Sequence, residues 1–325
     1  MGSLSDGFGR RFHYLRLSVT EVCNFRCTYC LPDGYRKAGP QDFLSVDEAG
    51  RLVSAFADLG LKKVRLTGGE PSARKDLDAI IARVAAVPGV EKLALTTNGW
   101  NLADKAEAWR AAGLSHLNVS VDSLDPGTFE RLTGHARLDQ VLAGVDRALD
   151  LGFQAVKLNA VLMRDTAEGF AAFADFVRER PVAVRFIELM RTGDNAELFR
   201  AQHLSGLVLK DWLTANGWRP RERGFDDGPA IEYEHPRHAG RLGLIAPYAP
   251  GFCDSCNRLR VTARGKLRLC LFGDGGIELR DLLQSDTVRP ALLARIIDSL
   301  GAKAAGHRLH ENDPGATRHL AQVGG

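Results

Sequence analysis

Residues 45–67 read SVDEAGRLVSAFADLGLKKVRLT, and they predict one helix followed by one strand. Ser45 and Glu48 form the S-x-x-E pattern that caps the start of a helix, apolar residues then recur at helical spacing, and Gly60 ends the pattern. The apolar segment at residues 64–67 has the length of a buried strand. A helix that leads directly into a buried strand is typical of a parallel α/β sheet.

The same alternation runs through the first 190 or so residues of the chain. Short apolar segments that we predict as strands lie at residues 15–19, 64–67, 92–96, 117–121, 155–162 and 182–187. Besides the helix that begins at Ser45, helical patterns lie at residues 75–87, 103–112, 138–151 and 167–180. Six such units are two short of a complete TIM barrel. We therefore expect an α/β fold, an incomplete (β/α)6 TIM-like barrel, with its active site at the carboxyl ends of the strands.

After residue 194 the regular alternation ends, and the chain becomes rich in Arg, Gly and Pro. We place the partial barrel in residues 1–194 and a less regular C-terminal region in residues 195–325. Within that region, residues 258–272 are predicted to form two strands joined by a turn at residues 263–266.

The composition is that of a soluble globular protein, with 325 residues, 45% hydrophobic and 26% charged. No apolar run approaches the roughly 18 residues of a membrane-spanning helix, and the first ten residues hold no apolar stretch typical of a secretory signal. We therefore expect a cytoplasmic protein with no membrane partner. The net charge of +3 is too small to indicate a nucleic-acid partner, although local groups of arginines could bind a compact polyanion.

Six cysteines fall into two groups that lie far apart in the sequence. Each group supplies three thiolates, whereas a four-iron cluster normally takes four, so one iron would stay open for another ligand. Because no export signal is evident, we expect reduced thiols that bind metal rather than disulfides. The first group is Cys23, Cys27 and Cys30, and the second is Cys253, Cys256 and Cys270.

Each group leaves an alternative open. For the first, the alternative is a zinc site with a fourth ligand from His13 or elsewhere. Beside the second cysteine group, Arg258 and Arg260 lie two residues apart on a predicted strand, so their side chains should point to the same face of it. Paired guanidiniums suit a triphosphate or a purine edge, and the alternative is a solvated basic strand next to a structural cluster.

The segment Gly68-Gly69-Glu70-Pro71 ends the second predicted strand. Glycines allow a backbone to approach a ligand closely, and the carboxylate of Glu70 could receive an ammonium group. Taken alone, the segment could also be an ordinary strand-to-helix turn.

Together these segments resemble a known family along nearly the whole chain. The first cysteine spacing with Tyr29, and the GGEP segment, resemble the radical S-adenosylmethionine superfamily. Within it, the chain resembles the GTP 3′,8-cyclase family of molybdenum cofactor biosynthesis. The resemblance is carried by RLSVT (16–20), CNFRC (23–27), TGGEP (67–71), TTNG (96–99), NVSVDSL (118–124), RFIELM (185–190), CNRLR (256–260) and the terminal Gly324 and Gly325.

The resemblance implies two [4Fe-4S] clusters and S-adenosylmethionine as cofactors. Cys23, Cys27 and Cys30 would hold the cluster that binds S-adenosylmethionine, and Cys253, Cys256 and Cys270 the cluster near the substrate. Tyr29, Gly69, Glu70, Ser120 and Met190 would line the S-adenosylmethionine site. Arg16, Arg65, Thr96, Lys157, Arg258, Leu259 and Arg260 would contact GTP, with Arg258 and Arg260 also taking part in catalysis.

The activity implied is that of a lyase. Reductive cleavage of S-adenosylmethionine would give a 5′-deoxyadenosyl radical that takes a hydrogen from C3′ of GTP, after which the sugar radical adds to C8 of guanine. The resemblance also implies a homodimer, a low-potential electron donor such as flavodoxin or ferredoxin, and product transfer to cyclic pyranopterin synthase. The alternatives are a radical enzyme that modifies peptides with the help of an auxiliary cluster, and a redox-sensing or electron-transfer protein.

Overall fold

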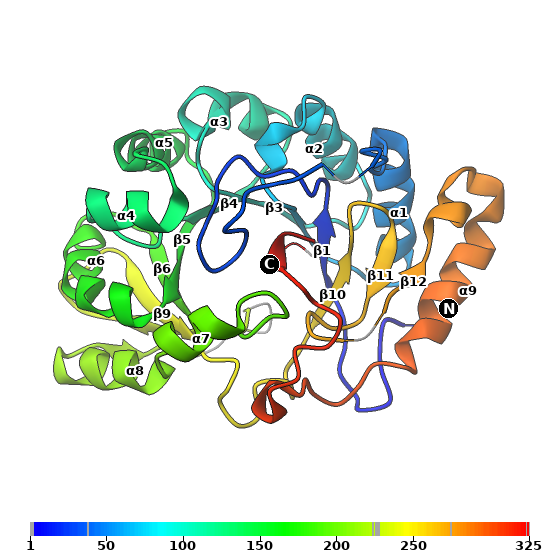
Figure 1. Ribbon diagram of the computed structural model, residues 1–325. Coiled ribbons are helices and arrows are strands. Elements are labelled where there is room, and N and C mark those ends of the chain that lie inside the picture. The colour runs from blue at the N-terminus through cyan, green and yellow to red at the C-terminus, as the bar shows by residue number, and fades with distance from the viewer. Residues whose placement is uncertain are drawn as a thin grey trace.

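The computed structural model describes residues 3–37, 39–222, 224, 228–273, 275–322 and 324. This part of the chain forms one curved sheet with helices around its outer side (Figure 1). Its strands are β1 (Tyr14–Ser18), β2 (Lys63–Thr67), β3 (Lys92–Thr97), β4 (His116–Ser120), β5 (Ala155–Leu162), β6 (Ala183–Glu188), β7 (Arg219–Pro220), β8 (Ile231–Glu234), β9 (Arg241–Ile245), β10 (Arg258–Val261), β11 (Lys266–Arg268) and β12 (Ile277–Glu278). They pair in the order β12-β11-β10-β1-β2-β3-β4-β5-β6-β9-β8-β7.

The α-helices of the described residues are α1 (Val46–Asp58), α2 (Leu77–Ala85), α3 (Leu102–Ala111), α4 (Pro126–Thr133), α5 (Leu138–Asp150), α6 (Phe170–Phe176), α7 (Ala196–Gln202), α8 (Gly206–Ala215) and α9 (Arg289–Leu300). Helices α1, α2, α3, α5 and α6 follow one another around the outside of the curve, with α4 beside α5 (Figure 1). None of these helices has both the length and the apolar character needed to cross a bilayer.

The six predicted strands are confirmed as β1 to β6, with ends that differ from the prediction by at most one residue. Neighbouring strands in this series pair in parallel, which confirms the α/β class with a parallel sheet. The hairpin predicted within residues 258–272 is also confirmed, because β10 and β11 pair antiparallel with Arg260 opposite Arg268.

Two further parallel strands come from the C-terminal region. Strand β10 pairs in parallel with β1, and β9 pairs in parallel with β6. The sheet therefore holds eight neighbouring parallel strands, where the sequence predicted six. Among the described residues no strand pairing joins β9 to β10, so hydrogen bonds do not close the barrel. The sequence pattern could not show this, because the paired strands are remote from each other along the chain.

Residues beyond 194 are also more regular than predicted, since α7, α8, β7, β8 and α9 lie there. Helix α4 was missed as well, although its signals are local. Asp125 accepts a hydrogen bond from the N–H of Thr128 at 2.8 Å, Pro126 stands in the first turn, and Gly134 ends the helix with φ of 77°. Helix α6 is shorter than the predicted 167–180, because a 3₁₀ segment precedes it.

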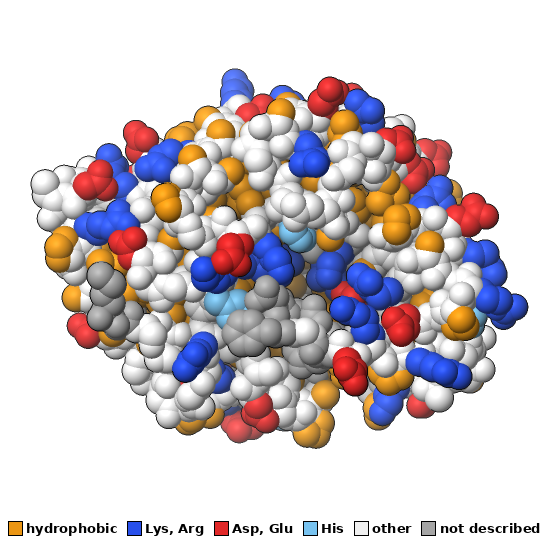
Figure 2. All heavy atoms as spheres, turned by 180° about the vertical axis from the view of Figure 1, so that it is seen from behind, with side chains coloured by type: hydrophobic (Ala, Val, Ile, Leu, Met, Phe, Trp, Pro, Cys, Tyr) orange, Lys and Arg blue, Asp and Glu red, His pale blue; other side chains and the backbone are white. Residues whose placement is uncertain are grey.

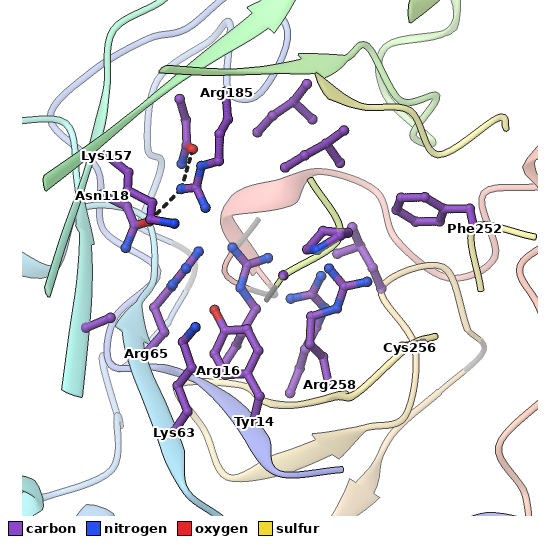
Figure 3. Close-up of a pocket in the computed structure, with 18 of the residues that line it drawn as sticks. Tyr14, Arg16, Lys63, Arg65, Asn118, Lys157, Arg185, Phe252, Cys256 and Arg258 are labelled. Atoms are coloured by element: carbon purple, nitrogen blue, oxygen red, sulfur yellow. Dashed lines mark hydrogen bonds between the residues drawn. The ribbon is translucent and has the colours of Figure 1, made fainter. Parts of the chain in front are cut away.

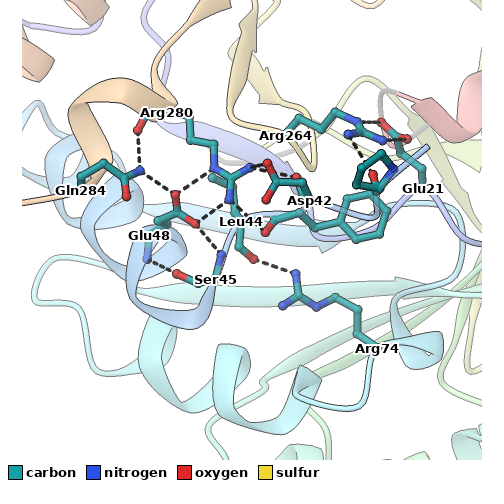
Figure 4. A network of polar contacts seen from close by, with 11 residues as sticks. Glu21, Asp42, Leu44, Ser45, Glu48, Arg74, Arg264, Arg280 and Gln284 are labelled. Atoms are coloured by element: carbon teal, nitrogen blue, oxygen red, sulfur yellow. Dashed lines mark hydrogen bonds and ion pairs between the residues drawn. The ribbon is translucent and has the colours of Figure 1, made fainter. Parts of the chain in front are cut away.

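The predicted cap of α1 is present and also anchors the C-terminal region (Figure 4). The N–H of Ser45 donates to Glu48 Oε2 at 2.7 Å, and Arg280 Nε and Gln284 Nε2 each donate to Glu48 Oε1 at 2.8 Å. Burial raises the pKa of Glu48, but these hydrogen bonds outweigh burial and lower the pKa to about 2. One carboxylate thus joins the start of α1 to the segment before α9.

The two faces of the sheet differ in chemistry. Alternate residues of each strand point to opposite faces. On β1, Leu15 and Leu17 are fully buried in the hydrophobic core, whereas Tyr14, Arg16 and Ser18 point to the inside of the curve. The interior is therefore lined by polar side chains and leaves space for a ligand, where an ordinary TIM barrel is filled with branched apolar residues.

Candidate active site

A cavity of about 310 Å³ lies inside the curve of the sheet. Side chains from β1, β2, β4, β5, β6 and β10 project into it, and Figure 3 shows them converging from opposite walls. From behind the view of Figure 1, Lys and Arg side chains gather around the middle of the face (Figure 2). The cations that line the cavity include Arg16, Lys63, Arg65, Lys157, Arg185, Arg258 and Arg260.

Three arginines stand side by side across neighbouring strands. Arg16 on β1 is in register with Arg260 on β10 and with Arg65 on β2, and adjacent strands lie about 4.8 Å apart. Burial, together with repulsion between neighbouring guanidiniums, lowers the pKa of Arg16 and of Arg65 to about 10. Such a concentration of buried positive charge is unfavourable unless an anion accompanies it.

Several donors in the cavity have no hydrogen-bond partner among the described residues. They are Nε of Arg16, Arg65 and Arg185, and Nη1 of Arg260. Arg185 does donate through Nη2 to Asn118 Oδ1 at 2.5 Å, as Figure 3 shows. Each unpaired buried donor costs about 1–3 kcal/mol. The set therefore fits a ligand with many acceptor atoms, and a triphosphate is such a ligand.

The second cysteine group faces this cavity. Cys253, Cys256 and Cys270 all line it, with Cys256 just before β10 and Cys270 just after β11. Burial raises the pKa of Cys256, but the positive charges of Arg258 and Lys303 outweigh burial and lower it. The thiolate form that binds metal is thus favoured at this position.

The first cysteine group lies in the loop after β1, and the pKa of each of its three thiols is raised, in contrast to that of Cys256. Burial is the main cause that raises the pKa of Cys23 to about 11 and that of Cys30 to about 12. Burial also raises the pKa of Cys27, and the charges of Asp122, Cys30 and Cys23 add to the effect. The N–H of Cys30 donates to the carbonyl of Cys27 at 3.0 Å, so this turn brings two of the three cysteines together.

The two groups lie at opposite ends of the same strand. Cys23 follows the carboxyl end of β1, and Cys256 precedes β10, whose first residue is in register with the first residue of β1. His13 precedes β1 at the end of the second group, where its Nε2 lies 3.1 Å from Asn257 Nδ2. The alternative of a zinc site at the first group with His13 as fourth ligand is therefore wrong, because β1 separates them.

In the described part of the chain, no three His, Cys, Asp or Glu side chains converge closely enough to bind one metal ion. A four-iron cluster does not require its cysteines to converge on one point, because each thiolate binds a different iron and the thiolates lie further apart than the ligands of a single ion. Three half-buried cysteines on one short loop provide a donor set of that kind.

The residues expected to bind S-adenosylmethionine gather at the carboxyl ends of β1, β2 and β4. Tyr29 donates its hydroxyl hydrogen bond to Asp122 Oδ2 at 2.8 Å, and Asp122 Oδ1 accepts from the N–H of Val161 at 2.8 Å. Ser120 ends β4, and Met190 follows β6 and lines the cavity.

The GGEP segment is held by hydrogen bonds within the chain. A Cβ on Gly69 would lie 2.3 Å from the carbonyl oxygen of Val22, so no other residue fits. The carboxylate of Glu70 is 1% exposed and accepts from the hydroxyl of Thr97 at 2.8 Å and from the N–H of Asn98 at 2.6 Å. Glu70 thus ties the turn to the end of β3, and the expectation that its carboxylate also receives an ammonium group stays a prediction.

Of the residues expected to contact GTP, Arg16, Arg65, Lys157, Arg258 and Arg260 line the cavity. The other two, Thr96 and Leu259, are placed differently.

Thr96 does not line the cavity, but its hydroxyl has no partner among the described residues, whereas that of neighbouring Thr97 is engaged by Glu70. The side chain of Leu259 is 1% exposed and belongs to the hydrophobic core, so only its backbone could reach a ligand.

The cavity also extends further than predicted. Lys63, His116 and Ala155, which line it, are at or next to the first residues of their strands, so the cavity reaches the amino ends as well as the carboxyl ends. Sequence reasoning missed Tyr14, Lys63, Asn118, Arg185 and Lys303. Asn118 and Arg185 could have been found by applying the two-residue repeat to every predicted strand, as was done for Arg258 and Arg260, whereas Tyr14 and Lys63 lie one residue before their predicted strands.

The C-terminal tail enters the same region. The N–H of Gly193 donates to the carbonyl of Thr317 at 3.0 Å, and Arg268 Nη2 donates to the Thr317 hydroxyl at 3.2 Å. Further on, a Cβ on Gly324 would lie 2.2 Å from Cγ2 of Thr67, the last residue of β2. The expected functional tail thus reaches the GGEP segment with Gly324, while Gly325 lies outside the described residues.

Known families match nearly the entire chain. The radical SAM superfamily matches residues 17–177, and the family described as Molybdenum Cofactor Synthesis C matches residues 182–309. The chain resembles the crystal structure of Streptococcus suis SuiB bound to S-adenosylmethionine, with a TM-score of 0.61 and 14% identity over 87% of this chain and 68% of that one. This likeness concerns the fold alone.

Curated relatives are much more similar in sequence. The chain is 57% identical over 326 residues to the GTP 3′,8-cyclase of Stenotrophomonas maltophilia, covering 100% of both chains. It is 55% identical over 331 residues to the GTP 3′,8-cyclase of Aeromonas hydrophila, covering 100% of this chain and 97% of the other.

Proposed function

The chain belongs to the GTP 3′,8-cyclase family of the radical SAM superfamily, and we propose that its basic cavity holds GTP between two iron–sulfur clusters. The enzyme converts GTP to (8S)-3′,8-cyclo-7,8-dihydroguanosine 5′-triphosphate, the first step of molybdenum cofactor biosynthesis. The observation that carries the proposal is the row of buried guanidiniums with unpaired donors, which lies beside one cysteine group and one strand length from the other.

The cysteines fit two [4Fe-4S] clusters with one open iron each. Cys23, Cys27 and Cys30 would hold the first, and Cys253, Cys256 and Cys270 the second. When bound, the first cluster and S-adenosylmethionine supply the radical that takes the hydrogen from C3′ of GTP.

The residues of the chain would position both reactants. Arg16 and Arg65 would bind the triphosphate with Lys157 on the opposite wall, since guanidiniums and ammonium groups match phosphate oxygens. Arg258 and Arg260 would bring the nucleotide to the second cluster, because they follow Cys256 directly on β10.

The cofactor site would be shaped by backbone and by neutral groups. Gly69 lets the GGEP turn lie against the backbone of Val22 and so would shape the site for the methionyl end of S-adenosylmethionine, with Ser120 at the end of β4 and Met190 after β6. Tyr29 is oriented by its hydrogen bond to Asp122. Glu70 would act by holding the turn in place.

Other parts of the proposal follow from the family. They are residues 1–194 as the cofactor-binding unit, residues 195–325 as the unit that adds the second cluster, a low-potential donor such as flavodoxin or ferredoxin, transfer of the product to cyclic pyranopterin synthase, a homodimer, and a cytoplasmic location. A peptide-modifying activity is less well supported, because a neutral peptide backbone does not require so many cations around one cavity.

Two adjacent lysines provide a test with a matched control. Lys63 lines the cavity, whereas Lys62 is half exposed and pairs with Glu91 at 2.8 Å. In anaerobic protein with about eight irons per chain, the number expected for two four-iron clusters, Lys63→Ala should raise the KM for GTP about tenfold. Lys62→Ala should leave it unchanged. Equal effects of the two substitutions, or no GTP conversion by the wild type, would contradict the proposal.

A further inference from the structure

One residue that the sequence did not single out stands in the most basic part of the cavity. Tyr14 opens β1, is 3% exposed, and is in register with Lys63 on one side and Arg258 on the other. Figure 3 shows its ring inside the cavity with the hydroxyl directed toward Arg16 and Arg65. Tyr14 is thus enclosed by cations from β1, β2 and β10.

The hydroxyl of Tyr14 has no hydrogen-bond acceptor among the described residues, although Arg16 is close enough to donate to its oxygen. The side chains around it, Arg16, Lys63, Arg65 and Arg258, carry donors only. The phenolic oxygen could accept from one of them, but its own proton has no acceptor there. A buried donor in this state is unfavourable, so the missing acceptor belongs to a ligand.

The ring of Tyr14 has a second role. Lys63 Nζ lies 4.8 Å and Arg65 Cζ lies 5.4 Å from the ring centroid, so both cations contact the π-system. The ring thereby holds two cations next to its own hydroxyl. Replacement by Phe would keep these contacts and remove only the hydroxyl.

We propose that Tyr14 is a binding residue for the triphosphate of the substrate, whose hydroxyl donates a hydrogen bond to a phosphate oxygen between Arg16 and Arg65. This rests on the proposed function, because it takes a nucleoside triphosphate as the ligand of the cavity. A phosphate oxygen is preferred to a base or ribose atom for a physical reason: the surrounding cations attract an anion, and a hydroxyl donates most strongly to a charged acceptor.

The electrostatics agree with this assignment. Burial raises the pKa of Tyr14, but Arg65, Arg16, Lys63 and Arg258 outweigh burial and lower the pKa to about 7. A bound triphosphate offsets these positive charges and favours the protonated phenol, which is the form that can donate.

Three ligands separate the phosphate contact from other roles. Equilibrium binding of GTP, inorganic triphosphate and guanosine is measured with anaerobic wild type and Tyr14→Phe, after both clusters are verified. Tyr14→Phe should weaken GTP and inorganic triphosphate each by about tenfold, the usual cost of losing a hydrogen bond to a charged group. Guanosine, which lacks phosphate, should bind both proteins within about twofold.

The control is Tyr233→Phe, because Tyr233 on β8 is equally buried but packs in the hydrophobic core. It should leave all three affinities unchanged. If Tyr14→Phe binds GTP as tightly as wild type, or loses guanosine as strongly as triphosphate, the inference is overturned. A wild type that binds neither GTP nor triphosphate would overturn the proposed function and this inference with it, an outcome distinct from the other two.

Discussion

The two ends of β1 hold cysteines whose charged neighbours differ. At the carboxyl end, Cys27 lies near Asp122, and burial together with negative neighbours raises its pKa. At the amino end, burial raises the pKa of Cys253, but Arg258 and Lys303 lower the pKa of Cys256. The difference matches the charges of the two reactants of the family, since S-adenosylmethionine is a sulfonium cation and GTP a polyanion. One strand thus separates a site suited to a cation from one suited to an anion.

The largest effect is expected at the carboxyl end of β1, when one of the three thiolates of the first cysteine group is removed. Cys27→Ser should abolish reductive cleavage of S-adenosylmethionine, because the first cluster loses one of its three ligands, while the spectrum of the second cluster persists. The measurement is 5′-deoxyadenosine formation under anoxia, with spectra of both clusters. Cys256→Ser is the counterpart and should leave the first cluster's spectrum intact. Unimpaired cleavage by Cys27→Ser would remove the first group from its assigned role.

At the amino end, loss of a cavity cation should impair the substrate alone. Arg260→Ala should weaken GTP binding by about thirtyfold or more, since a buried charge-assisted contact is worth roughly 2–5 kcal/mol when truncated. Cleavage of S-adenosylmethionine without substrate should persist. Lys266→Ala, on the same hairpin but half exposed and paired with Glu278, serves as control in equilibrium binding. Affinities within a factor of two for Arg260→Ala would show that GTP binds elsewhere.

The C-terminal tail approaches the carboxyl end, so altering it should affect turnover more than folding. Gly324 has φ of 66° and no room for a Cβ beside Thr67, and Gly324→Ala should displace the tail and reduce GTP conversion about tenfold. Deletion of residues 324–325 should act in the same direction. Gly7→Ala, at a site with no neighbouring atom within 4 Å, should leave conversion and the melting temperature unchanged. Full activity of the truncated protein would contradict a functional tail.

The smallest effect is expected at Glu48, which lies away from both ends of β1. Its pKa of about 2 lies below the 4.5 of an ordinary Glu, so its stabilising contribution is complete above about pH 4.5 and is lost as pH falls toward 2. Glu48→Gln should lower the free energy of unfolding at neutral pH by about 1–2 kcal/mol, and the difference should vanish near pH 2. Urea unfolding across this range checks it. Glu91→Gln, at an exposed position, is the control and should leave the free energy of unfolding at neutral pH nearly unchanged, and a constant difference for Glu48→Gln would contradict the assignment.

The sequence predicted the structure correctly where the structure depends on local patterns. The strands β1 to β6 and the cap of α1 follow from apolar spacing and from Ser45 with Glu48. Helix α4 shows that a local signal can be overlooked, because Asp125, Pro126 and Gly134 marked its ends. Thr96 and Thr97 could not be distinguished from the sequence. Only the structure shows that the hydroxyl of Thr97 donates a hydrogen bond to Glu70.

The sequence by itself determined the parallel α/β class, the two cysteine groups and the family, since spacing along the chain carries all three. Only the tertiary structure decided that β9 and β10 flank the six-stranded series, and that Arg260, Arg16 and Arg65 stand in one row with Tyr14 among the cations. The physical reason is that strand order and register arise from packing between segments far apart in the chain. Alternation within a strand gives the face of a residue, but its neighbours across the sheet are fixed only when the strands pair.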